Sequence, residues 1–378
     1  MSNILFIAPG FPPAVNGVGD YTYHLAKEFV RDGHSVRVIT HTADHDDGMV
    51  EGIRLYRIAE SWSVADCRAI LKLLDAQPAD LVILQYVPHG YHYQGLPFPL
   101  LVLIAVIKRR GIRLFTFFHE VYIDRIPYNL RRNIGSWLMR RITRRIARQS
   151  DYVATSINHY RQLLTQLLPP EAPPVGVIPI ASNVPEIAVS EDELQATRRS
   201  ITGGADVPII AFFGARDVQL AFRGIEILIA EGLPLRVLLI GKNMAEVPDH
   251  LLPYVRRTGI LPLNGISRYL QAADIFILPE PSHWGAQFKS GSLIAALRAG
   301  LPVLSCQGTV GRDDLLQDGE NILFTDFTDT PQLASDLRRL LTDPALRQRL
   351  SRGARTVAEP ITWPATYQAY QAIIASHA

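Results

Sequence analysis

Two arginines flank a loop that joins an apolar run to a helix-forming segment in the second half of the chain. In FFGARDVQLAFRGIEILI (212–229), Arg216 follows the apolar run and Arg223 stands at the start of the helical segment. A guanidinium group can donate two parallel hydrogen bonds to a phosphate, so this pair is suited to gripping a diphosphate. The alternative is a pair of exposed surface arginines that bind nothing.

A second set of anion-binding groups is expected in WGAQFKSGSLIAALRAGLPVLS (284–305). This stretch has the pattern of a loop, a helix that stops at Gly300, and a strand. Backbone N–H groups are unsatisfied at the start of a helix, and the helix dipole favours an anion there by ~0.3–1 kcal/mol. The serines could also cap the helix, a role that is compatible with anion binding. The residues expected to bind the anion are Lys289, Ser290, Gly291 and Ser292.

Polar residues follow two apolar runs in the first half of the chain. The run RLFTFFHE ends in His119 and Glu120, where residues of a parallel sheet enter a ligand site. A single histidine can be purely structural, but its place at a strand end favours a function. Such residues suit a ligand with hydroxyl groups, for example a saccharide. The stretch QYVPHGYHYQG adds Gln85, Tyr86 and His89 to this set.

A glycine-bearing loop, PGFPPAVNGVGDYTYHLAKEF (9–29), precedes a helical segment near the N-terminus. Gly17 and Gly19 lie just before that helix, so backbone N–H groups there can approach a phosphate or sugar oxygen closely. The motif lacks the third glycine of a dinucleotide fingerprint, and the next strand is not followed by a well-placed acid. A nicotinamide-dependent oxidoreductase is therefore disfavoured, and a flexible loop remains the alternative.

Apolar runs alternate with helix-period segments along almost the whole chain. The runs are continuous and not alternating, as expected for strands covered by helices on both faces of a parallel sheet. The pattern restarts after VIPIASNVPE (177–186). This predicts an α/β protein with two Rossmann-like, doubly wound parallel-sheet domains that face each other across a cleft. The expected parts are residues 1–183, residues 184–360, and a helix at 361–378 that returns to the first domain. The expected strands are 3–9, 35–41, 53–59, 81–87, 113–120, 152–157 and 175–180, then 207–214, 236–241, 275–280 and 302–306.

Composition limits the functional classes. The 378 residues include 38 Lys or Arg and 36 Asp or Glu, and a net charge of +2 argues against a nucleic-acid partner. Cys67 and Cys306 are far apart, which favours a reduced, cytoplasmic compartment. The apolar run 96–107 is too short to cross a bilayer, which needs ~20 residues. The acids at 44–47 are interpreted as a solvated turn, so no metal site is expected.

One helical segment, NLRRNIGSWLMRRITRRIARQS (129–150), carries many arginines and no acid. Trp137, Leu138, Ile142 and Ile146 are expected to form an opposing apolar stripe. That pattern suits docking on an anionic membrane surface. A surface helix with its apolar stripe in the core is an equal alternative. The arginines are Arg131, Arg132, Arg140, Arg141, Arg144, Arg145 and Arg148.

In the order of these motifs, the chain resembles the family-four retaining glycosyltransferases of the GT-B fold over nearly its whole length. The similar stretches are the glycine loop, VIPIASNVP, GARDVQLAFRG, and the region from LQAADIFILPEPSHWG to GENILF. The resemblance implies a nucleotide-sugar donor, UDP- or GDP-linked, bound mainly to the second domain. It implies an acceptor on the first domain, retention of anomeric configuration, and no metal or other cofactor.

The resemblance also implies roles for single residues. Arg216 and Arg223 would grip the diphosphate, and Gly17 or Gly19 would approach the donor. His119 matches a histidine beside the reacting sugar, and Asp314 stands where the family has an acid before a D-G turn.

Two positions depart from the family pattern. Gln287 and Ala295 stand where the family has glutamates that contact the sugar hydroxyls and the ribose. Gln287 can still bond a sugar hydroxyl, but Ala295 can bond nothing. We therefore expect donor binding to depend more on the diphosphate than on the ribose. The departures leave open a non-catalytic GT-B protein that binds a nucleotide sugar or a partner glycosyltransferase.

Overall fold

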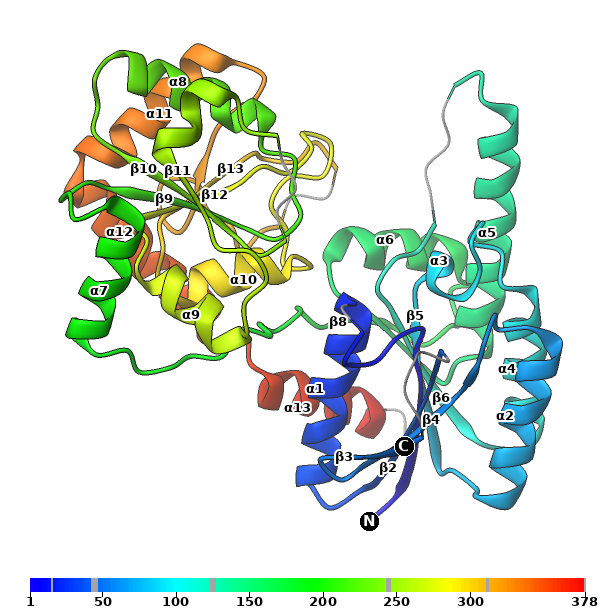
Figure 1. The fold of residues 1–378 in the computed structure, drawn as a ribbon. Helices are drawn as coiled ribbons and strands as arrows, with labels where there is room; N and C mark the ends of the chain where they lie inside the picture. The colour runs from blue at the N-terminus through cyan, green and yellow to red at the C-terminus, as the bar shows by residue number, and fades with distance from the viewer. Residues whose placement is uncertain (15, 42–46, 123–126, 243–245, 311–312, 377–378) are drawn as a thin grey trace. The chain divides into compact units, whose positions relative to one another are not determined.

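The protein forms two compact α/β units. The computed structural model describes residues 1–14, 16–41, 47–122, 127–242, 246–310 and 313–376. One unit consists of Met1–Pro179 with Trp363–Ala378, and the other of Ile180–Thr362 (Figure 1). The boundaries expected from the sequence, 183/184 and 360/361, lie a few residues from those observed.

The first unit is built on an eight-stranded sheet with the order β3-β4-β2-β1-β5-β6-β7-β8. All neighbouring strands are parallel except β3 and β4, which are antiparallel. The short edge strand β3 was not among the strands expected from the sequence. The strands are β1 (Asn3–Ile7), β2 (Ser35–His41), β3 (Gly48–Val50), β4 (Ile53–Ala59), β5 (Leu81–Tyr86), β6 (Arg113–Phe118), β7 (Tyr152–Thr155) and β8 (Val175–Val177).

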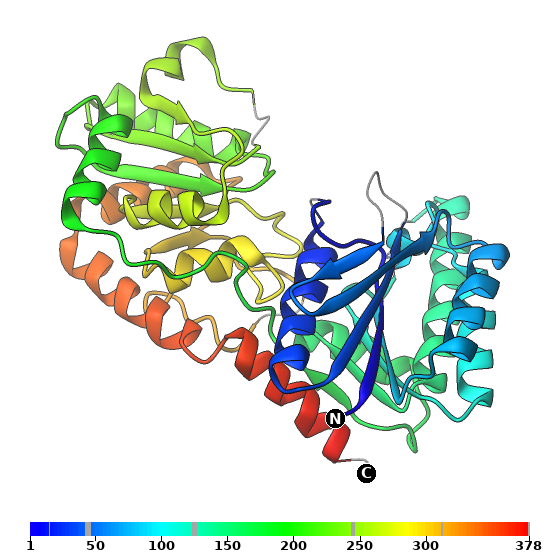
Figure 2. The same cartoon turned by 60° about the horizontal axis from the view of Figure 1, so that its bottom comes forward.

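Helices cover both faces of this sheet because the central strands are buried on both sides. Helices α1 and α13 pack on each other on one face, and α2, α4 and α5 lie on the other (Figures 1 and 2). The helices are α1 (Gly17–Arg31), α2 (Val64–Ala76), α3 (Pro88–Tyr91), α4 (Phe98–Arg109), α5 (Leu130–Gln149), α6 (Asn158–Leu167) and α13 (Trp363–Ala375).

The C-terminal helix α13 belongs to the first unit through its aromatic residues. Tyr370 is fully buried, and its ring stacks on Phe115 with the centroids 4.4 Å apart. Its hydroxyl lies 3.3 Å from the hydroxyl of Tyr21 on α1. The end of the chain therefore completes the core around β6.

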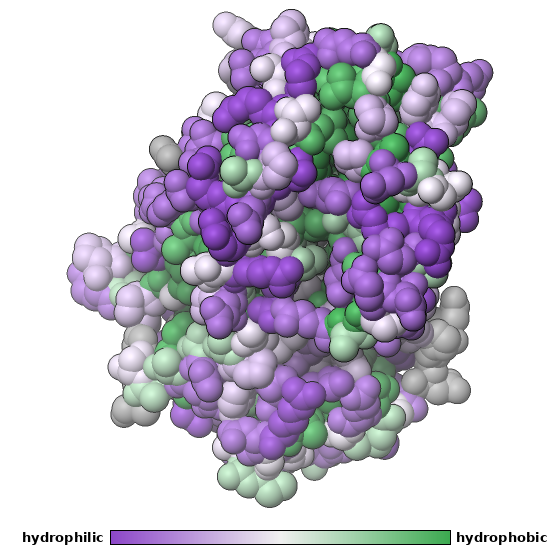
Figure 3. All heavy atoms as spheres, turned by 90° about the vertical axis from the view of Figure 1, so that its left-hand side faces the viewer, coloured by the Kyte–Doolittle hydropathy of each residue, from purple (hydrophilic) through white to green (hydrophobic). Residues whose placement is uncertain are grey.

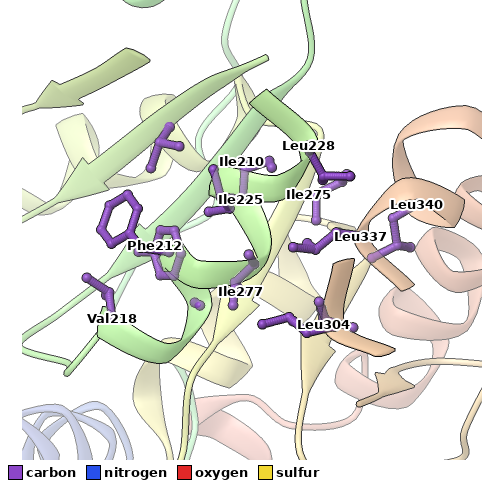
Figure 4. Packing of buried hydrophobic residues seen from close by; sticks show 14 of the residues in the cluster. Ile210, Phe212, Val218, Ile225, Leu228, Ile275, Ile277, Leu304, Leu337 and Leu340 are labelled. Atoms are coloured by element: carbon purple, nitrogen blue, oxygen red, sulfur yellow. The ribbon is translucent and has the colours of Figure 1, made fainter. Parts of the chain in front are cut away.

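The second unit contains a six-stranded parallel sheet with the order β11-β10-β9-β12-β13-β14. Its core packs apolar strand residues against α8 and α11, as Figure 4 shows for Ile210, Ile277 and Leu337. A side chain at Gly224 would come within 2.6 Å of Leu333, so α8 and α11 approach closely there. The strands are β9 (Ile209–Phe213), β10 (Arg236–Ile240), β11 (Val255–Arg257), β12 (Ile275–Leu278), β13 (Val303–Ser305) and β14 (Leu323–Phe324). The helices are α7 (Glu191–Thr202), α8 (Gln219–Ala230), the 3-10 helix η1 (Asp249–Tyr254), α9 (Leu263–Gln271), α10 (Gly291–Arg298), α11 (Thr330–Thr342) and α12 (Pro344–Ala358).

The surface is mixed in polarity. Hydrophilic residues cover much of the face drawn in Figure 3, and hydrophobic residues are exposed between them. In the part of the chain that the structure describes, no helix combines the length and hydropathy needed to span a membrane.

Candidate functional site

Three segments of the second unit meet at the carboxyl ends of β9 and β12, which are neighbours in the sheet. Arg216 lies in the loop after β9, Glu280 follows β12, and Ser290 is the N-cap of α10. The Arg216 guanidinium forms an ion pair with Glu280 (Nη1 to Oε1, 2.8 Å) and donates a hydrogen bond to Ser290 (Nη2 to Oγ, 3.1 Å). Arg216 is therefore held at the start of α10, as the proposed grip on a diphosphate requires.

The first turn of α10 combines capping with unsatisfied amides. The Ser290 hydroxyl accepts a hydrogen bond from Leu293 N at 3.4 Å, so the serine caps the helix. Gly291 and Ser292 are the next two residues, and helix geometry leaves their N–H groups without an intrahelical acceptor. A Cβ atom added at Gly214 would lie 3.2 Å from the Ser292 hydroxyl. The loop after β9 therefore approaches the first turn of α10 closely. These amides face the same region as Arg216 and are suited to an anion.

The positive charge at the start of α10 is smaller than the sequence suggested, because Glu280 lies beside Arg216 and Lys289. Lys289 lies near Glu280, and its ammonium group is 4.1 Å from the centre of the Trp284 ring. Burial raises the pKa of Glu280, while the charges of Arg216 and Lys289 oppose that shift. Two cations therefore share one carboxylate, and sequence reasoning missed this acid. Its place directly after a buried strand was the available signal.

Arg223 does not belong to this cluster. It lies in the second turn of α8, which begins at Gln219, and its side chain is exposed. Among the described residues it has no hydrogen bond or ion pair, and no contact joins it to Arg216. Its exposed guanidinium is open to a ligand, and the expectation that both arginines bind one diphosphate stays a prediction.

The acid beside the 287–290 segment is Asp313 and not Asp314. Asp313 Oδ2 accepts a hydrogen bond from Phe288 N at 3.2 Å, and burial raises the pKa of this carboxyl group. Asp314 lies on the adjacent turn with its side chain exposed. The two acids therefore point in different directions, and the assignment of Asp314 to the donor stays a prediction.

Gln287 has a structural role in this state. Its side chain is 2% exposed, and Nε2 donates a hydrogen bond to Val310 O at 3.2 Å. It therefore ties the 281–290 loop to the loop that follows β13. The same two loops approach closely at Gly285, where a side chain would lie 2.0 Å from Gly308 N.

Ala295 is also buried, on the face of α10 that lines a cavity of about 500 Å³. The cavity is shared with Glu186 and Arg298, which form an ion pair of 2.5 Å. The substitution of the family glutamate by alanine therefore coincides with an open space in the unit.

His119 is the central polar residue of the first unit. It follows β6, and its backbone N–H donates to Tyr86 O at 2.9 Å. Its Nε2 lies 2.7 Å from Gln85 Oε1, and both side chains are buried. Burial lowers the pKa of His119 to about 3, so the ring is neutral at pH 7. An amide oxygen only accepts, so this contact assigns the proton of the neutral ring to Nε2 and leaves the lone pair on Nδ1.

The other predicted acceptor residues separate into buried and exposed ones. Tyr86 is fully buried and packs against Tyr91 and Phe118, so the expectation that it contacts an acceptor is at odds with the structure. Gln85 is also fully buried, and its observed partner is His119. His89 on α3 and Glu120 after β6 are exposed and available to a ligand.

Two backbone N–H groups at the start of α1 are already hydrogen-bonded to the N-cap residue, Asn16. The Asn16 side chain accepts hydrogen bonds from Val18 N and Gly19 N, both at 2.9 Å. A side chain at Gly19 would lie 2.9 Å from Phe11 N, so this glycine permits close packing of α1 on the preceding loop. Gly17 is exposed, and its amide is the one in this turn that Asn16 leaves to a ligand. The predicted approach to a donor therefore rests on Gly17 and not on Gly19.

The described residues contain no group of three or more His, Cys, Asp or Glu that could hold a metal ion. Residues 44–46 of the predicted solvated turn lie outside the described residues.

Two family models match successive parts of the chain. A glycosyl transferase 4-like domain matches residues 16–181, and a glycosyl transferases group 1 domain matches residues 208–343. The chain belongs to the GT-B glycosyltransferases. A comparison with curated proteins gives no match.

Solved structures of other proteins share the fold of this GT-B glycosyltransferase. HepE of Anabaena, in complex with UDP and glucose, is 15% identical with a TM-score of 0.69 over 100% of both chains. WaaG, a glycosyltransferase involved in lipopolysaccharide biosynthesis, is 17% identical with a TM-score of 0.63 over 98% of both chains. A TarM variant of S. aureus, in complex with UDP and two glycan compounds, is 10% identical with a TM-score of 0.70 over 99% of both chains.

Two polar centres of this glycosyltransferase are thus defined by their contacts. One is the Arg216–Glu280–Ser290 cluster at the carboxyl edge of the second sheet. The other is the His119–Gln85 pair at the carboxyl edge of the first sheet. The first can stabilise an anion, and the second presents a neutral imidazole that can take part in a hydrogen bond.

Proposed function

We propose that this glycosyltransferase moves a sugar from a nucleotide-diphosphate sugar to a hydroxyl acceptor, with retention of anomeric configuration and without a metal ion. The observation that carries the proposal is Arg216, held beside the free amides of α10 in a chain of this family. Two further facts support a UDP- or GDP-linked donor. HepE was crystallised with UDP-glucose, and the TarM complex contains UDP.

The proposed chemistry depends on stabilising the leaving group. As the bond between sugar and phosphate stretches, negative charge accumulates on the diphosphate. Arg216, Lys289 and the first amides of α10 would stabilise that charge without having to reorganise. The acceptor hydroxyl would attack on the same face of the sugar, and its proton would pass to the departing phosphate oxygen. This route needs no carboxylate nucleophile, so the buried Gln287 does not prevent it.

The proposed acceptor is a saccharide or a lipid-linked molecule with a free hydroxyl group. His119 Nδ1 supports this proposal because a neutral imidazole nitrogen accepts a hydrogen bond from a hydroxyl. The exposed His89 and Glu120 add polar groups to the same part of the unit. We place the reaction in the cytoplasm, in the synthesis of a glycan, polysaccharide or glycoconjugate, with attachment to a membrane surface.

The alternative is a non-catalytic protein of the same fold that binds a nucleotide sugar or a partner glycosyltransferase. The observation that favours it is the burial of Gln287. The contacts of Arg216 with Glu280 and Ser290, together with the neutral His119, favour an enzyme. Both alternatives require nucleotide binding, and they differ in turnover.

Nucleotide binding is tested by thermal unfolding with UDP, GDP and ADP. A ligand at a hundred times its dissociation constant stabilises the folded protein by ~2.7 kcal/mol, which raises its melting temperature measurably. We expect UDP or GDP to do so in the wild type and not in Arg216→Ala. Arg199→Ala, at an exposed position of α7 outside the candidate site, is the matched control and should bind like the wild type. If no nucleotide stabilises the wild type, the proposed function is wrong.

Turnover is then measured with UDP- and GDP-sugars and a panel of saccharide acceptors, by release of the nucleoside diphosphate. The anomeric configuration of the product is determined by NMR. A protein that binds nucleotide but releases no diphosphate supports the non-catalytic alternative. Equal activity in the presence of EDTA is expected for a metal-independent reaction.

A further inference from the structure

The arginine-rich helix α5 presents one exposed stripe with two different halves. Leu130, Ile134 and Trp137 occupy its N-terminal half, with exposed fractions of 75%, 51% and 44%. Arg141 and Arg148 continue the same stripe in the C-terminal half. These residues follow one another at spacings of three, four or seven, so they lie on one side of the helix. The stripe therefore changes from apolar to basic about halfway along α5.

The opposite side of α5 is the one that packs in the core. Met139, Ile142 and Ile146 are buried there, as the surface-helix alternative required. The expectation that Trp137 shares their stripe was wrong, because Trp137 lies on the exposed side with the arginines. The apolar residues of the outer stripe are therefore not part of that buried core.

The basic half forms a groove of about 450 Å³ against α6. Trp137 closes it at one end, and Leu167 of α6 lies on its wall. In the described parts of the chain, no acidic side chain pairs with any arginine of the groove. Two of them instead lie over aromatic rings, Arg140 over Tyr122 at 4.1 Å and Arg141 over Trp137 at 4.4 Å. The arginines are Arg140, Arg141, Arg144, Arg145 and Arg148.

The apolar half lies at the projecting end of the helix. In Figure 1, the N-terminal half of α5 extends beyond α4 and α6. Tyr128, just before the helix, is fully exposed and extends the apolar surface by one more ring. The helix rises ~1.5 Å per residue, so the apolar half is ~15 Å long and the basic half follows directly behind it.

We propose that α5 docks the protein on an anionic bilayer, with Leu130, Ile134 and Trp137 inserted among the lipids and the arginine groove on the headgroup phosphates. Aromatic and aliphatic residues beside a basic cluster are the two parts of interfacial membrane binding. Tryptophan is suited to the boundary because its ring is apolar and its N–H is polar. The inference extends the membrane attachment suggested above, and it does not depend on donor chemistry.

Charge argues against a second copy of this chain as the occupant. A two-fold contact brings identical surfaces together, so the arginines of one groove would face those of the other. A free polyphosphate would satisfy the arginines, but it would leave the apolar half exposed. A bilayer satisfies both halves at once.

The experiment is co-sedimentation of the full chain with vesicles of phosphatidylcholine, with and without phosphatidylglycerol. We expect the wild type to bind the anionic vesicles and not the neutral ones, and binding to weaken as salt is raised. Each arginine near an anionic surface strengthens binding about fivefold, so the triple variant Arg144→Gln, Arg145→Gln, Arg148→Gln should bind on the order of 100-fold more weakly. The control is Arg199→Gln, Arg256→Gln, Arg352→Gln, which removes the same charge from exposed sites of the other unit and should bind like the wild type.

Insertion is measured separately with lipids brominated in their acyl chains, which quench nearby tryptophan fluorescence. Quenching is expected in the wild type and should largely disappear in Trp137→Phe. Wild-type protein that stays in the supernatant overturns the proposal, as does equal binding of the two triple variants. Binding without Trp137 quenching, or complete competition by inorganic tripolyphosphate, would show a soluble polyanion site instead. Nucleotide-induced stabilisation of the triple variant should match the wild type, so failure here is distinct from failure of the proposed function.

Discussion

The C-terminal helix makes a direct prediction about stability, because a single residue near the end of the chain fills the core of the first unit. Tyr370 is 0% exposed and stacks on Phe115 at 4.4 Å and on Phe117 at 5.9 Å. Phe117 in turn packs on His119 at 4.7 Å, and so does Tyr21 at 4.9 Å. Replacing Tyr370 by alanine therefore opens a cavity next to the residues that position His119.

The magnitude follows from the size of the cavity. Truncation of a fully buried aromatic residue to alanine typically lowers the free energy of unfolding by ~3–5 kcal/mol. Tyr370→Phe keeps the ring and removes only the hydroxyl that lies 3.3 Å from the Tyr21 hydroxyl. A lost hydrogen bond of this kind costs ~0.5–1.5 kcal/mol. The two variants should thus separate the packing of the ring from the bond of its hydroxyl.

The assay is urea unfolding followed by tryptophan fluorescence, with and without the nucleotide that stabilises the wild type. With a urea dependence of ~1–3 kcal/mol per molar, Tyr370→Ala should lower the midpoint of the first unit's transition by about 1 M or more. Nucleotide binding should persist if the donor binds the second unit. Gln368→Ala, at an exposed position of the same helix, is the control. If Tyr370→Ala unfolds at the wild-type midpoint and retains full turnover, α13 does not complete this core.

Three further predictions concern the loops and charges of the site. Gly285→Ala should lower the free energy of unfolding of the second unit by at least ~2 kcal/mol, measured by thermal unfolding. The reason is that φ is +62° and a Cβ atom would lie 2.0 Å from Gly308 N. Gly203→Ala is the control and should cost less, because φ is +69° but the space around it is open. Burial lowers the pKa of His24 from 6.5 to about 4, so the unfolded chain takes up this proton at a higher pH than the folded chain. The free energy of unfolding should therefore fall as the pH drops from about 6.5 to about 4. His24→Gln should lose part of this pH dependence, and an unchanged slope would contradict the assignment. Glu280→Gln removes the carboxylate charge beside Arg216 and should tighten nucleoside diphosphate binding severalfold by calorimetry, whereas weaker binding would mean that the charge of Glu280 is needed to position Arg216.

The fold could be predicted because each strand carries its own local signal. The expected runs at 81–87 and 113–120 correspond to β5 (Leu81–Tyr86) and β6 (Arg113–Phe118), and 236–241 corresponds to β10 (Arg236–Ile240). Continuous apolar sequence is enough to place such strands in a parallel sheet covered on both faces. The edge strand β3 was missed because Gly48–Val50 is short and is partly exposed. Edge strands lack the buried faces that produce the signal.

The contacts of the site were harder to predict because they join segments that are distant in sequence. Glu280 reaches Arg216 only because β12 and β9 are adjacent in the sheet, and local sequence does not encode strand order. Which of the two acids Asp313 and Asp314 bonds to Phe288 N depends on the direction in which each side chain leaves the turn. Gln85 could be expected near a polar site, but its 2.7 Å contact with His119 requires the pairing of β5 with β6.

The arrangement of charge explains how a site without the usual two glutamates can retain an acid. Gln287 and Ala295 are both buried and neutral, whereas Glu280 supplies a carboxylate from the end of β12. That carboxylate orients Arg216 and also offsets part of its charge. A diphosphate would therefore meet an oriented cation with free helix amides beside it, in a cluster whose net charge is close to one. Such a site favours an anion that takes two hydrogen bonds from one guanidinium over an anion that needs many separate cations.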